Sequence, residues 1–437
     1  MPLDAEHEGT SSRPRLVAPV TVAEIELTEP DAVSYVSVAE ADRDEIRQAL
    51  VLVRIGGRPL TTIVVDAPAG RVDAKACVAQ AQAAVAIENA APGDASGTTS
   101  ELTAADGSLA EAQPPLISVV IATRERALSL ARCLKSLSRL DYPNYEVIVV
   151  DNDPVTEDTA QLVRQWTDFS VHYIREDRRG LAAAHNRGLQ EAKGAIVAFS
   201  DDDVIIDKNW LREIAKGFRA ADNVACVTGL IMAAELQTQP QVMLETHGNF
   251  NKGVRTRVID RGAHRPADPL FPFTVGKLGS GANMSFHRDK LRAMGGFDPA
   301  LGVGTAAHGG DDLAAFFTVI ANGFQLVYQP TALVWHHHRL DHDSLAAQAY
   351  GYGIGISAYL MSSLCRHPAM IGQAFWRAPA GLAYAFGSNS PRRAVTARDG
   401  WPRELIRLER KGLLLGPFAY ARSRWRTRNV PRLLPED

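Results

Sequence analysis

Short apolar runs alternate with amphipathic stretches through the middle of this chain, and this alternation limits the fold more than any other feature. Each run has the length of one strand and is apolar enough to be covered on both faces. The stretches between the runs have the apolar spacing of helices. The runs are residues 116–123, 146–151, 171–174 and 195–200, and the helical stretches are residues 130–137, 158–166 and 181–192. The order βαβαβαβ predicts an α/β fold with a doubly wound, mostly parallel sheet.

Polar side chains follow three of these predicted strands at the points where the strands end. Ligands of such sheets bind outside the carboxyl ends of the strands, so these side chains are expected to face one site. The three groups are Thr123-Arg124-Glu125-Arg126, Asp151-Asn152-Asp153 and Asp201-Asp202-Asp203. The sequence therefore predicts a polar binding site along this edge.

The chemistry of this edge favours a nucleotide and a divalent cation. No G-x-G-x-x-G and no G-x-x-x-x-G-K-[ST] motif follows the first strand, which disfavours a dinucleotide fold and a phosphate-binding P-loop. Asp151 offers hydrogen-bond acceptors to a base or ribose, and Asp201 and Asp203 offer hard oxygens to Mg²⁺ or Mn²⁺. Three aspartates before a helix are also compatible with a polar turn and an N-cap.

Two clusters further along the chain fit the same site. Asp311 and Asp312 precede a helical stretch over residues 313–321, where a carboxylate is stabilised by the helix dipole or acts as a general base. A strand-like segment over residues 325–335 ends in His336-His337-His338. These histidines fit a metal site, a phosphate contact or a polar turn.

Taken in order, these segments resemble the motif set of family 2 inverting glycosyltransferases of the GT-A fold. The resemblance covers roughly residues 115–340. The motifs are Ile117 to Arg126, Glu146 to Asp153, Gly180 to Leu189, Ala195 to Asp203, Gly281 to Asp298 and Gly310 to His336. It implies metal-dependent transfer of a sugar from a nucleoside-diphosphate sugar, with a UDP-sugar favoured, to a hydroxyl group of a glycan, a lipid-linked glycan or a small molecule.

The resemblance also assigns roles to residues. It implies that Asp312 is the general base, with Asp311 in the place of the family's glutamate, and that Mn²⁺ or Mg²⁺ is the cofactor. The nucleotide-sugar site is expected to comprise Thr123, Arg124, Arg126, Asp151, Asp153, Asn186, Asp201 and Asp202. The loop near the sugar and acceptor is Gly281, Ala282 and Asn283, and the expected metal ligands are Asp203, Asp201, His336 and His338. His185 precedes Asn186 where the family commonly has Arg, so a phosphate contact there is not expected.

Two alternative functions remain to be weighed. A sugar-1-phosphate nucleotidyltransferase shares the sheet architecture but needs a glycine-rich loop with a lysine, and residues 123–130 contain neither glycine nor lysine. A non-catalytic membrane-associated scaffold that retains the fold predicts loss of the metal-binding or basic carboxylates. Asp201, Asp203 and Asp312 are all present.

At 437 residues the chain is longer than one usual domain. We expect a disordered lead-in over residues 1–18, a small strand-rich domain over residues 19–88 and a linker rich in Ala, Gly and Ser over residues 89–114. The GT-A-like domain is expected over residues 115–343, followed by a helical, basic region over residues 344–437.

The net charge of −3 conceals a basic carboxyl-terminal region. Residues 364–437 contain 14 Lys and Arg against 5 Asp and Glu, whereas the preceding residues contain 33 against 45. Its basic residues are interleaved with Trp376, Trp401, Phe418, Tyr420 and Trp425, a composition typical of an interfacial helix on anionic lipid. A solvated face against the catalytic domain is the alternative. No recognition motif supports nucleic-acid binding.

The expected location is the cytoplasm, with peripheral association at the inner face of the membrane. No apolar leader segment opens the sequence, and the four cysteines are widely spaced, as in a reducing compartment. Residues 344–365 are long enough to span a bilayer, but their polarity favours a buried or interfacial helix.

Overall fold

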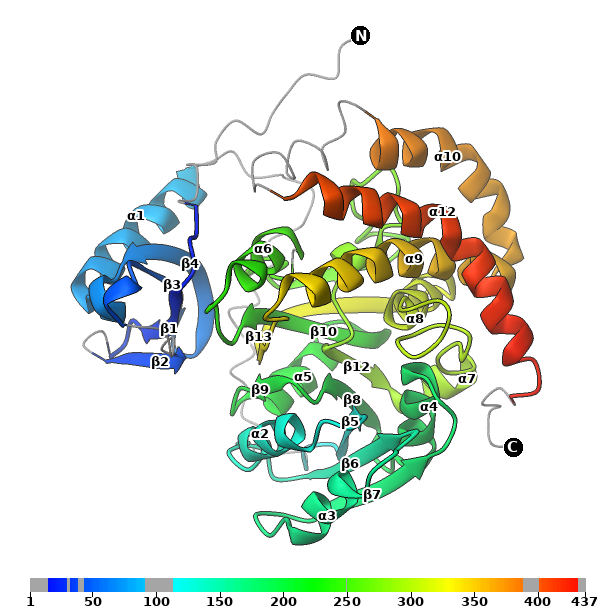
Figure 1. Cartoon of the computed structure of the whole chain (residues 1–437), viewed down its shortest axis with the longest axis horizontal. Helices are drawn as coiled ribbons and strands as arrows, with labels where there is room; N and C mark the ends of the chain where they lie inside the picture. The colour runs from blue at the N-terminus through cyan, green and yellow to red at the C-terminus, as the bar shows by residue number, and fades with distance from the viewer. Residues whose placement is uncertain are drawn as a thin grey trace. The chain divides into compact units, whose positions relative to one another are not determined.

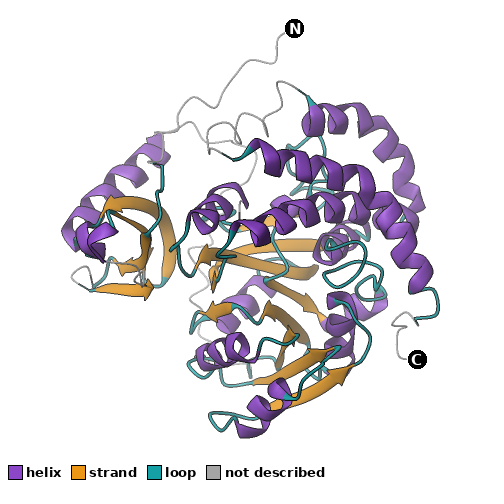
Figure 2. Cartoon of the chain, viewed as in Figure 1, coloured by secondary structure: helices purple, strands orange, loops and turns teal. Residues whose placement is uncertain are grey.

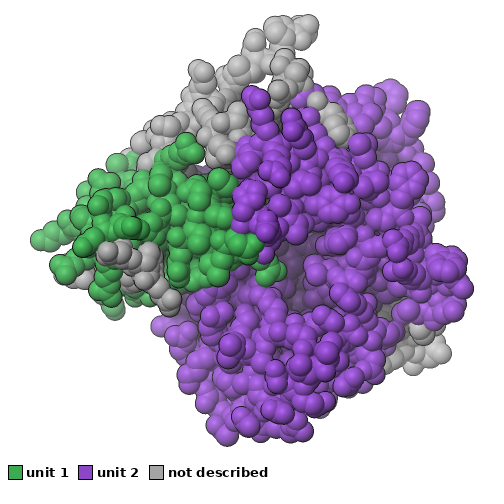
Figure 3. Space-filling model, in the orientation of Figure 1, with its two compact units in different colours: residues 1–101, 233–248, 338–341 green, residues 102–232, 249–337, 342–437 purple. Residues whose placement is uncertain are grey.

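The computed structural model describes residues 15–29, 32–37, 43–90, 113–248, 250–387 and 401–430. Residues 1–14 of the lead-in expected over residues 1–18 lie outside the described residues, as do residues 91–112 of the linker expected over residues 89–114. Two basic residues of the tail, Arg392 and Arg393, also lie outside them. The chain forms two compact units (Figure 3). One comprises residues 1–101, 233–248 and 338–341, and the other comprises residues 102–232, 249–337 and 342–437.

The first unit is built on a four-stranded sheet with the order β2-β1-β3-β4. Its strands are β1 (Val20–Glu26), β2 (Val33–Ser37), β3 (Gln48–Ile55) and β4 (Arg58–Asp66), and its helices are α1 (Ala74–Ala90) and α6 (Gln239–Gly248). Buried and more exposed residues alternate along β4, which is typical of a sheet with one covered face. This region is rich in strands, as predicted.

The second unit contains a nine-stranded sheet (Figure 2). Its main path has the order β11-β13-β10-β12-β8-β5-β6-β7, and β9 pairs with β13. The strands are β5 (Ile117–Thr123), β6 (Tyr145–Asn152), β7 (Val171–Glu176), β8 (Ile196–Asp201), β9 (Val204–Ile206), β10 (Val224–Ala233), β11 (Arg257–Ile259), β12 (Asn283–His287) and β13 (Gln325–His336). The neighbours β8, β5, β6 and β7 are parallel. The predicted α/β fold is confirmed.

The second half of this sheet differs from the first. β12 runs antiparallel to both β8 and β10, and β13 runs antiparallel to β9 and β11. Antiparallel pairing brings the carboxyl end of β13 beside the segment that follows β8. The functional residues of the two halves can therefore meet at one edge.

Helices cover the sheet because each has an apolar face that must be buried. In α2, for example, Leu130, Cys133, Leu134 and Leu137 recur at helical spacing and are all buried. The helices of this layer are α2 (Ala127–Leu137), α3 (Asp158–Gln165), α4 (Leu181–Glu191), α5 (Trp210–Phe218), α7 (Arg288–Ala293) and α8 (Asp311–Ala321).

The described part of the carboxyl-terminal region forms three long helices, α9 (His342–Arg366), α10 (Ile371–Phe386) and α12 (Arg403–Arg426) (Figure 1). Ala358, Tyr359 and Tyr420 belong to the same hydrophobic core as the sheet strands. Among the described helices, none is both long and apolar enough to span a bilayer.

The start of α8 is in close contact with α9. Gly310 has a φ of +85°, and a Cβ atom at this position would lie 2.5 Å from the carbonyl oxygen of Gly355. A side chain at residue 310 would thus face both backbone strain and a steric clash. The close crossing of these two helices requires glycine here.

Candidate active site

The end of β8 and the end of β13 bring three metal-ligating side chains together. Ligand atoms of Asp201, Asp203 and His336 all lie within 4.8 Å of one another. The pairing of β13 with β9 sets His336 opposite Val204, and the backbone N–H of His337 donates to the carbonyl oxygen of Asp203 at 2.9 Å. The cluster is therefore held by the sheet rather than by a flexible loop.

Two basic side chains face Asp203. His336 Nε2 lies 3.2 Å from Oδ1, and Arg126 Nη2 lies 2.9 Å from Oδ2. Burial acts to raise the pKa of Asp203, but the attraction of His336 and Arg126 lowers this pKa overall. Asp203 is thus kept ionised, as a metal ligand must be.

Asp202 is held differently from its neighbours. It accepts hydrogen bonds of 2.6 Å from both Arg126 Nη1 and Thr123 Oγ1. Burial raises its pKa to about 7 although Arg126 opposes this. The contacts of Asp202 fix the orientation of Arg126 and of the end of β5.

The donor set of the cluster fits a divalent cation. Two carboxylates supply the hard oxygens that Mg²⁺ and Mn²⁺ prefer, and an imidazole is a suitable ligand for Mn²⁺. Burial, followed by repulsion from Asp203, raises the pKa of Asp201. A cation between Asp201 and Asp203 would remove this repulsion. The chemistry of these residues therefore fits a bound cation.

The end of β6 presents an open hydrogen-bond acceptor. Asp151 is buried, and its Oδ2 accepts a 2.9 Å hydrogen bond from the Tyr173 hydroxyl on β7. Its Oδ1 has no hydrogen-bond partner among the described residues. Burial raises the pKa of Asp151, and a donor group from a base or ribose would satisfy Oδ1. Nearby, Arg124 Nη2 contacts Asp153 Oδ2 at 3.0 Å.

Asp312 is held at the start of α8 by two backbone groups. Its Oδ2 accepts from the N–H of Gly281 at 2.9 Å, and its Oδ1 accepts from the N–H of Leu313 at 2.8 Å. Burial and then the charge of Asp311 raise the pKa of Asp312 to about 6. A carboxylate with such a pKa is suited to accept a proton near neutral pH.

Asp311 faces a histidine. His185 Nδ1 lies 3.4 Å from Asp311 Oδ2, and both side chains are buried. The His185 ring packs against Phe199 and Phe297. His185 therefore lies inside the fold next to the acidic pair.

One short chain of contacts connects the metal-ligating cluster to Asp312. Ser200 precedes Asp201 and donates a 2.7 Å hydrogen bond to the carbonyl oxygen of Ala282. The adjacent residue, Gly281, donates to Asp312. The predicted loop thus joins the two carboxylate clusters through its backbone.

Several predicted site residues use their side chains within the fold. Both amide atoms of Asn186 bond to the backbone of Phe297, at 2.9 Å each. Asn283 is buried and bonds to Trp210, Leu230 and Ala332. Their predicted contacts with a substrate stay predictions.

The structure does not bring His338 to the metal-ligating cluster. Its side chain is buried, and its Nε2 lies 2.9 Å from Glu245 Oε2 on α6. The chain turns after β13, so His336 and His338 belong to different compact units. A run of three histidines in the sequence gives no information about this turn.

The sequence reasoning did not identify Tyr173 and Lys252. Tyr173 reaches Asp151 from the neighbouring strand, a contact that depends on strand register and leaves no local motif. Burial and then Arg257 lower the pKa of Lys252 to about 8, and Asp312 opposes this shift. Lys252 thus lies within electrostatic reach of Asp312, although nothing in residues 249–256 resembles a site motif.

Comparison with known proteins shows similarity to glycosyltransferases over part of the chain. The model of "Glycosyl transferase family 2" matches residues 118–274. The pre-mycofactocin glycosyltransferase of Mycobacterium tuberculosis is 30% identical over 274 residues, covering 60% of this chain and 52% of that protein. Glycosyltransferase AglE of Haloferax volcanii is 35% identical over 105 residues, or 22% of this chain and 33% of that protein. The chain thus spans about half or less of these relatives.

Among solved structures, the mannosyltransferase PcManGT from Pyrobaculum calidifontis in complex with GDP-Man and Mn²⁺ aligns with a TM-score of 0.42 at 20% identity. The alignment covers 72% of this chain and 86% of that one.

Proposed function

Because residues 118–274 belong to glycosyl transferase family 2, we propose that this chain transfers a sugar from a nucleoside-diphosphate sugar to a hydroxyl acceptor. The proposed reaction inverts the anomeric configuration and depends on Mn²⁺ or Mg²⁺. The proposed acceptor is a cell-surface glycan, a lipid-linked glycan or another glycoconjugate. A UDP-sugar is the first donor to test.

The observation that carries this proposal is the link between the two carboxylate clusters. Ser200, Ala282 and Gly281 connect the end of β8 to Asp312 through two hydrogen bonds. A general base and a cation site fixed to one another in this way suit a displacement in which the base and the leaving group act on opposite sides of one carbon.

Asp151 and its neighbours are proposed to hold the nucleotide. The unpartnered Oδ1 of Asp151 would accept a hydrogen bond from the base or ribose, and Tyr173 holds the opposite oxygen in place. Thr123 and Arg124 complete this end of the site. Arg126, Asp202 and Asp153 position one another through the ion pairs described above.

Asp312 is proposed to act as the general base. It would take the proton from the acceptor hydroxyl, whose oxygen attacks the anomeric carbon in line with the departing nucleoside diphosphate. The N–H groups of Gly281 and Leu313 hold its two oxygens, so the carboxylate is already oriented before the acceptor arrives. One displacement without a covalent intermediate gives inversion.

Asp201, Asp203 and His336 are proposed to hold the cation. When bound there, the cation would supply Lewis-acid stabilisation of the negative charge on the leaving diphosphate. Arg126 contacts Asp203 and would keep that carboxylate ionised and oriented.

A donor panel tests the proposal. Purified protein is incubated with UDP-, GDP- and dTDP-sugars, with Mn²⁺, with Mg²⁺ and with EDTA, and the release of nucleoside diphosphate is measured. We expect metal-dependent release from at least one donor, which Asp312→Asn and Asp203→Ala each reduce. If no donor is bound or turned over with either metal, the chain is not a glycosyltransferase of this kind.

A further inference from the structure

The helix α12 has two distinct faces. The buried face repeats at intervals of three or four residues and packs on α9; it comprises Leu405, Glu409, Gly412, Gly416, Tyr420 and Ser423. Two glycines make this contact close, since a Cβ at Gly412 would lie 2.4 Å from Tyr350 O and one at Gly416 would lie 2.5 Å from Ile354 O. The close packing fixes the rotation of α12, and so fixes which residues face outward.

The opposite face of α12 combines large apolar and basic side chains in one row. In chain order the row is Arg407, Lys411, Leu414, Phe418, Arg422 and Trp425, again at intervals of three or four residues. Leu414, Phe418 and Trp425 are 65%, 75% and 66% exposed. Single exposed apolar residues are common on protein surfaces, but a row of three on one helix face is characteristic of a binding surface.

The five aromatic residues that are interleaved with basic residues in this region differ in exposure. Trp401 and Tyr420 are buried, at 5% and 3% exposure, and they pack inside the fold. Phe418 and Trp425 remain available on α12, and Trp376 is exposed on α10. Only these three of the five aromatic residues are therefore exposed enough to contact a membrane.

The charge of α12 favours an anionic partner. The helix contains seven basic residues, Lys or Arg, and two Glu residues. One of the two, Glu409, lies on the buried face. Arginine and lysine beside outward Leu, Phe and Trp are the composition of helices that lie in the headgroup region of anionic membranes.

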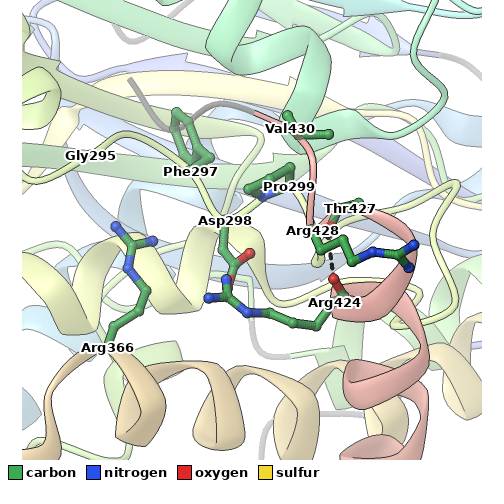
Figure 4. Close-up of a pocket in the computed structure, with 9 residues that line it drawn as sticks. All are labelled: Gly295, Phe297, Asp298, Pro299, Arg366, Arg424, Thr427, Arg428 and Val430. Carbon is green, nitrogen blue, oxygen red and sulfur yellow. Dashed lines mark hydrogen bonds between the residues drawn. The ribbon is translucent and has the colours of Figure 1, made fainter. Parts of the chain in front are cut away.

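A cavity of about 140 Å³ adjoins the carboxyl end of this row (Figure 4). Three arginines line it, Arg366, Arg424 and Arg428, against a single carboxylate, Asp298. Asp298 already accepts hydrogen bonds from Ser362, Tyr420 and the N–H of Ala300.

The cavity and the outward row share a boundary. The guanidinium of Arg428 lies 4.6 Å from the centre of the Trp425 ring. Anionic groups bound at the cavity would therefore lie beside Trp425, as the phosphate and the acyl region of one lipid would.

We propose that the outward face of α12 docks on the surface of an anionic lipid bilayer. Phe418 and Trp425 enter the headgroup region, Arg407, Lys411 and Arg422 contact anionic lipids, and the arginine-lined cavity receives a lipid phosphate. This docking does not require that the chain transfers sugars. It would bring the candidate active site to acceptors carried by the same membrane.

Vesicle sedimentation of the full chain tests the proposal. Wild type is compared on vesicles of phosphatidylcholine alone and of phosphatidylcholine with 30% phosphatidylglycerol. We expect binding to the anionic vesicles only, lost in 0.5 M NaCl. Arg407→Gln/Lys411→Gln/Arg422→Gln should lower the partition coefficient by about 10²-fold, and Phe418→Ser/Trp425→Ser by about tenfold or more.

Matched control variants carry the same changes elsewhere. Arg132→Gln/Arg139→Gln/Arg265→Gln removes three exposed charges, and Val17→Ser/Val155→Ser removes two apolar residues that are 60% and 77% exposed. Both should bind like wild type. Equal binding of wild type to the two kinds of vesicle, or an equal loss in the control variants, would overturn the proposal.

Two further readouts separate lipid docking from misfolding and from general polyanion binding. Tryptophan emission should shift to the blue on anionic vesicles, and Trp425→Phe should bind but lack most of that shift. Each variant should retain the thermal midpoint and donor hydrolysis of wild type, so a failure of donor hydrolysis bears on the proposed function alone. Competition by duplex DNA as effective as that by anionic lipid would refute a lipid-specific surface.

Discussion

The carboxylates that follow β8 and those that begin α8 are surrounded by different groups. Asp203 has Arg126 and His336 within 3.2 Å, and its pKa is lowered despite burial. Asp312 is held by two backbone N–H groups and lies beside the like charge of Asp311, and its pKa is raised to about 6. Asp203 is arranged to stay charged, and Asp312 is arranged to take up a proton.

Aspartate can therefore supply two kinds of chemistry in one site, depending on its neighbours. Burial alone raises the pKa of either carboxylate, so the neighbours decide the outcome. The basic groups beside Asp203 keep it ionised, as a metal ligand must be, whereas the anion beside Asp312 favours a base.

The largest expected effect is that of Asp312→Asn. The amide keeps the shape of the side chain but cannot accept the proton, so kcat for sugar transfer should fall by about 10²- to 10⁴-fold. Donor affinity, measured by calorimetry, should change little. Asp289→Asn is the matched control because Asp289 occupies the first turn of α7 and is exposed. Similar losses in the two variants would contradict a base role for Asp312.

A comparable but smaller loss is expected from removal of the cation site. Asp203→Ala should lower kcat/KM by about 10²- to 10³-fold, because several kcal/mol of charge stabilisation is lost. EDTA should inactivate wild type, and added Mn²⁺ should restore wild type but not the variant. Asp177→Asn, at an exposed ion pair with Arg175, serves as the control. Full activity of Asp203→Ala in EDTA would contradict a cation site at Asp203.

The pH profile should distinguish the clusters next. Asp312 must be deprotonated to act as a base, so kcat/KM should be high above its pKa of about 6 and should fall as the pH drops below that value. Asp311→Asn removes the neighbouring charge that helps to raise this pKa, and should therefore move the acidic limb to lower pH. A limb at the same pH in both proteins would mean that Asp311 does not influence the base.

The smallest expected effect is on the stability of the contact between α9 and the start of α8, the helix that carries Asp312. Gly310→Ala should reduce the free energy of unfolding by about 1–3 kcal/mol, because its Cβ would lie 2.5 Å from Gly355 O. Gly372→Ala in α10 is the control, since no atom lies within 4 Å of its Cβ, and it should be neutral or slightly stabilising. Urea unfolding measures both. Equal stability of the two variants would contradict the close crossing of α8 and α9.

The sequence predicted the parallel part of the sheet because its strands are continuous apolar runs separated by amphipathic helices. β5, for example, is buried at every position, so its composition alone distinguishes it from an exposed segment. The antiparallel pairing of β12 with β8 and β10 depends on contacts between distant segments. No local pattern encodes such contacts, so the sequence predicts a strand over residues 325–335 but not the pairing of the strands in the second half of the sheet.

The family resemblance predicted that Asp201, Asp203 and His336 share one site, whereas the strand pattern alone does not, because His336 reaches the site through the antiparallel pairing of β13 with β9. The contact between His185 and Asp311 was not predicted, since it joins a residue of α4 to the first residue of α8, far along the chain. His338 was expected in the same site but lies elsewhere. His336, two residues earlier, belongs to the metal-ligating cluster, whereas a turn in the backbone directs His338 to Glu245.

The helix α9 has a consequence for how this protein can be modified. One side of α9 contacts Gly310 at the start of the helix that carries Asp312, and another side carries α12 through glycine contacts. A chain shortened near residue 343 would lose the helix that packs against the start of α8. Point substitutions on the outward face of α12 therefore test the proposed docking without this loss, whereas a truncation does not.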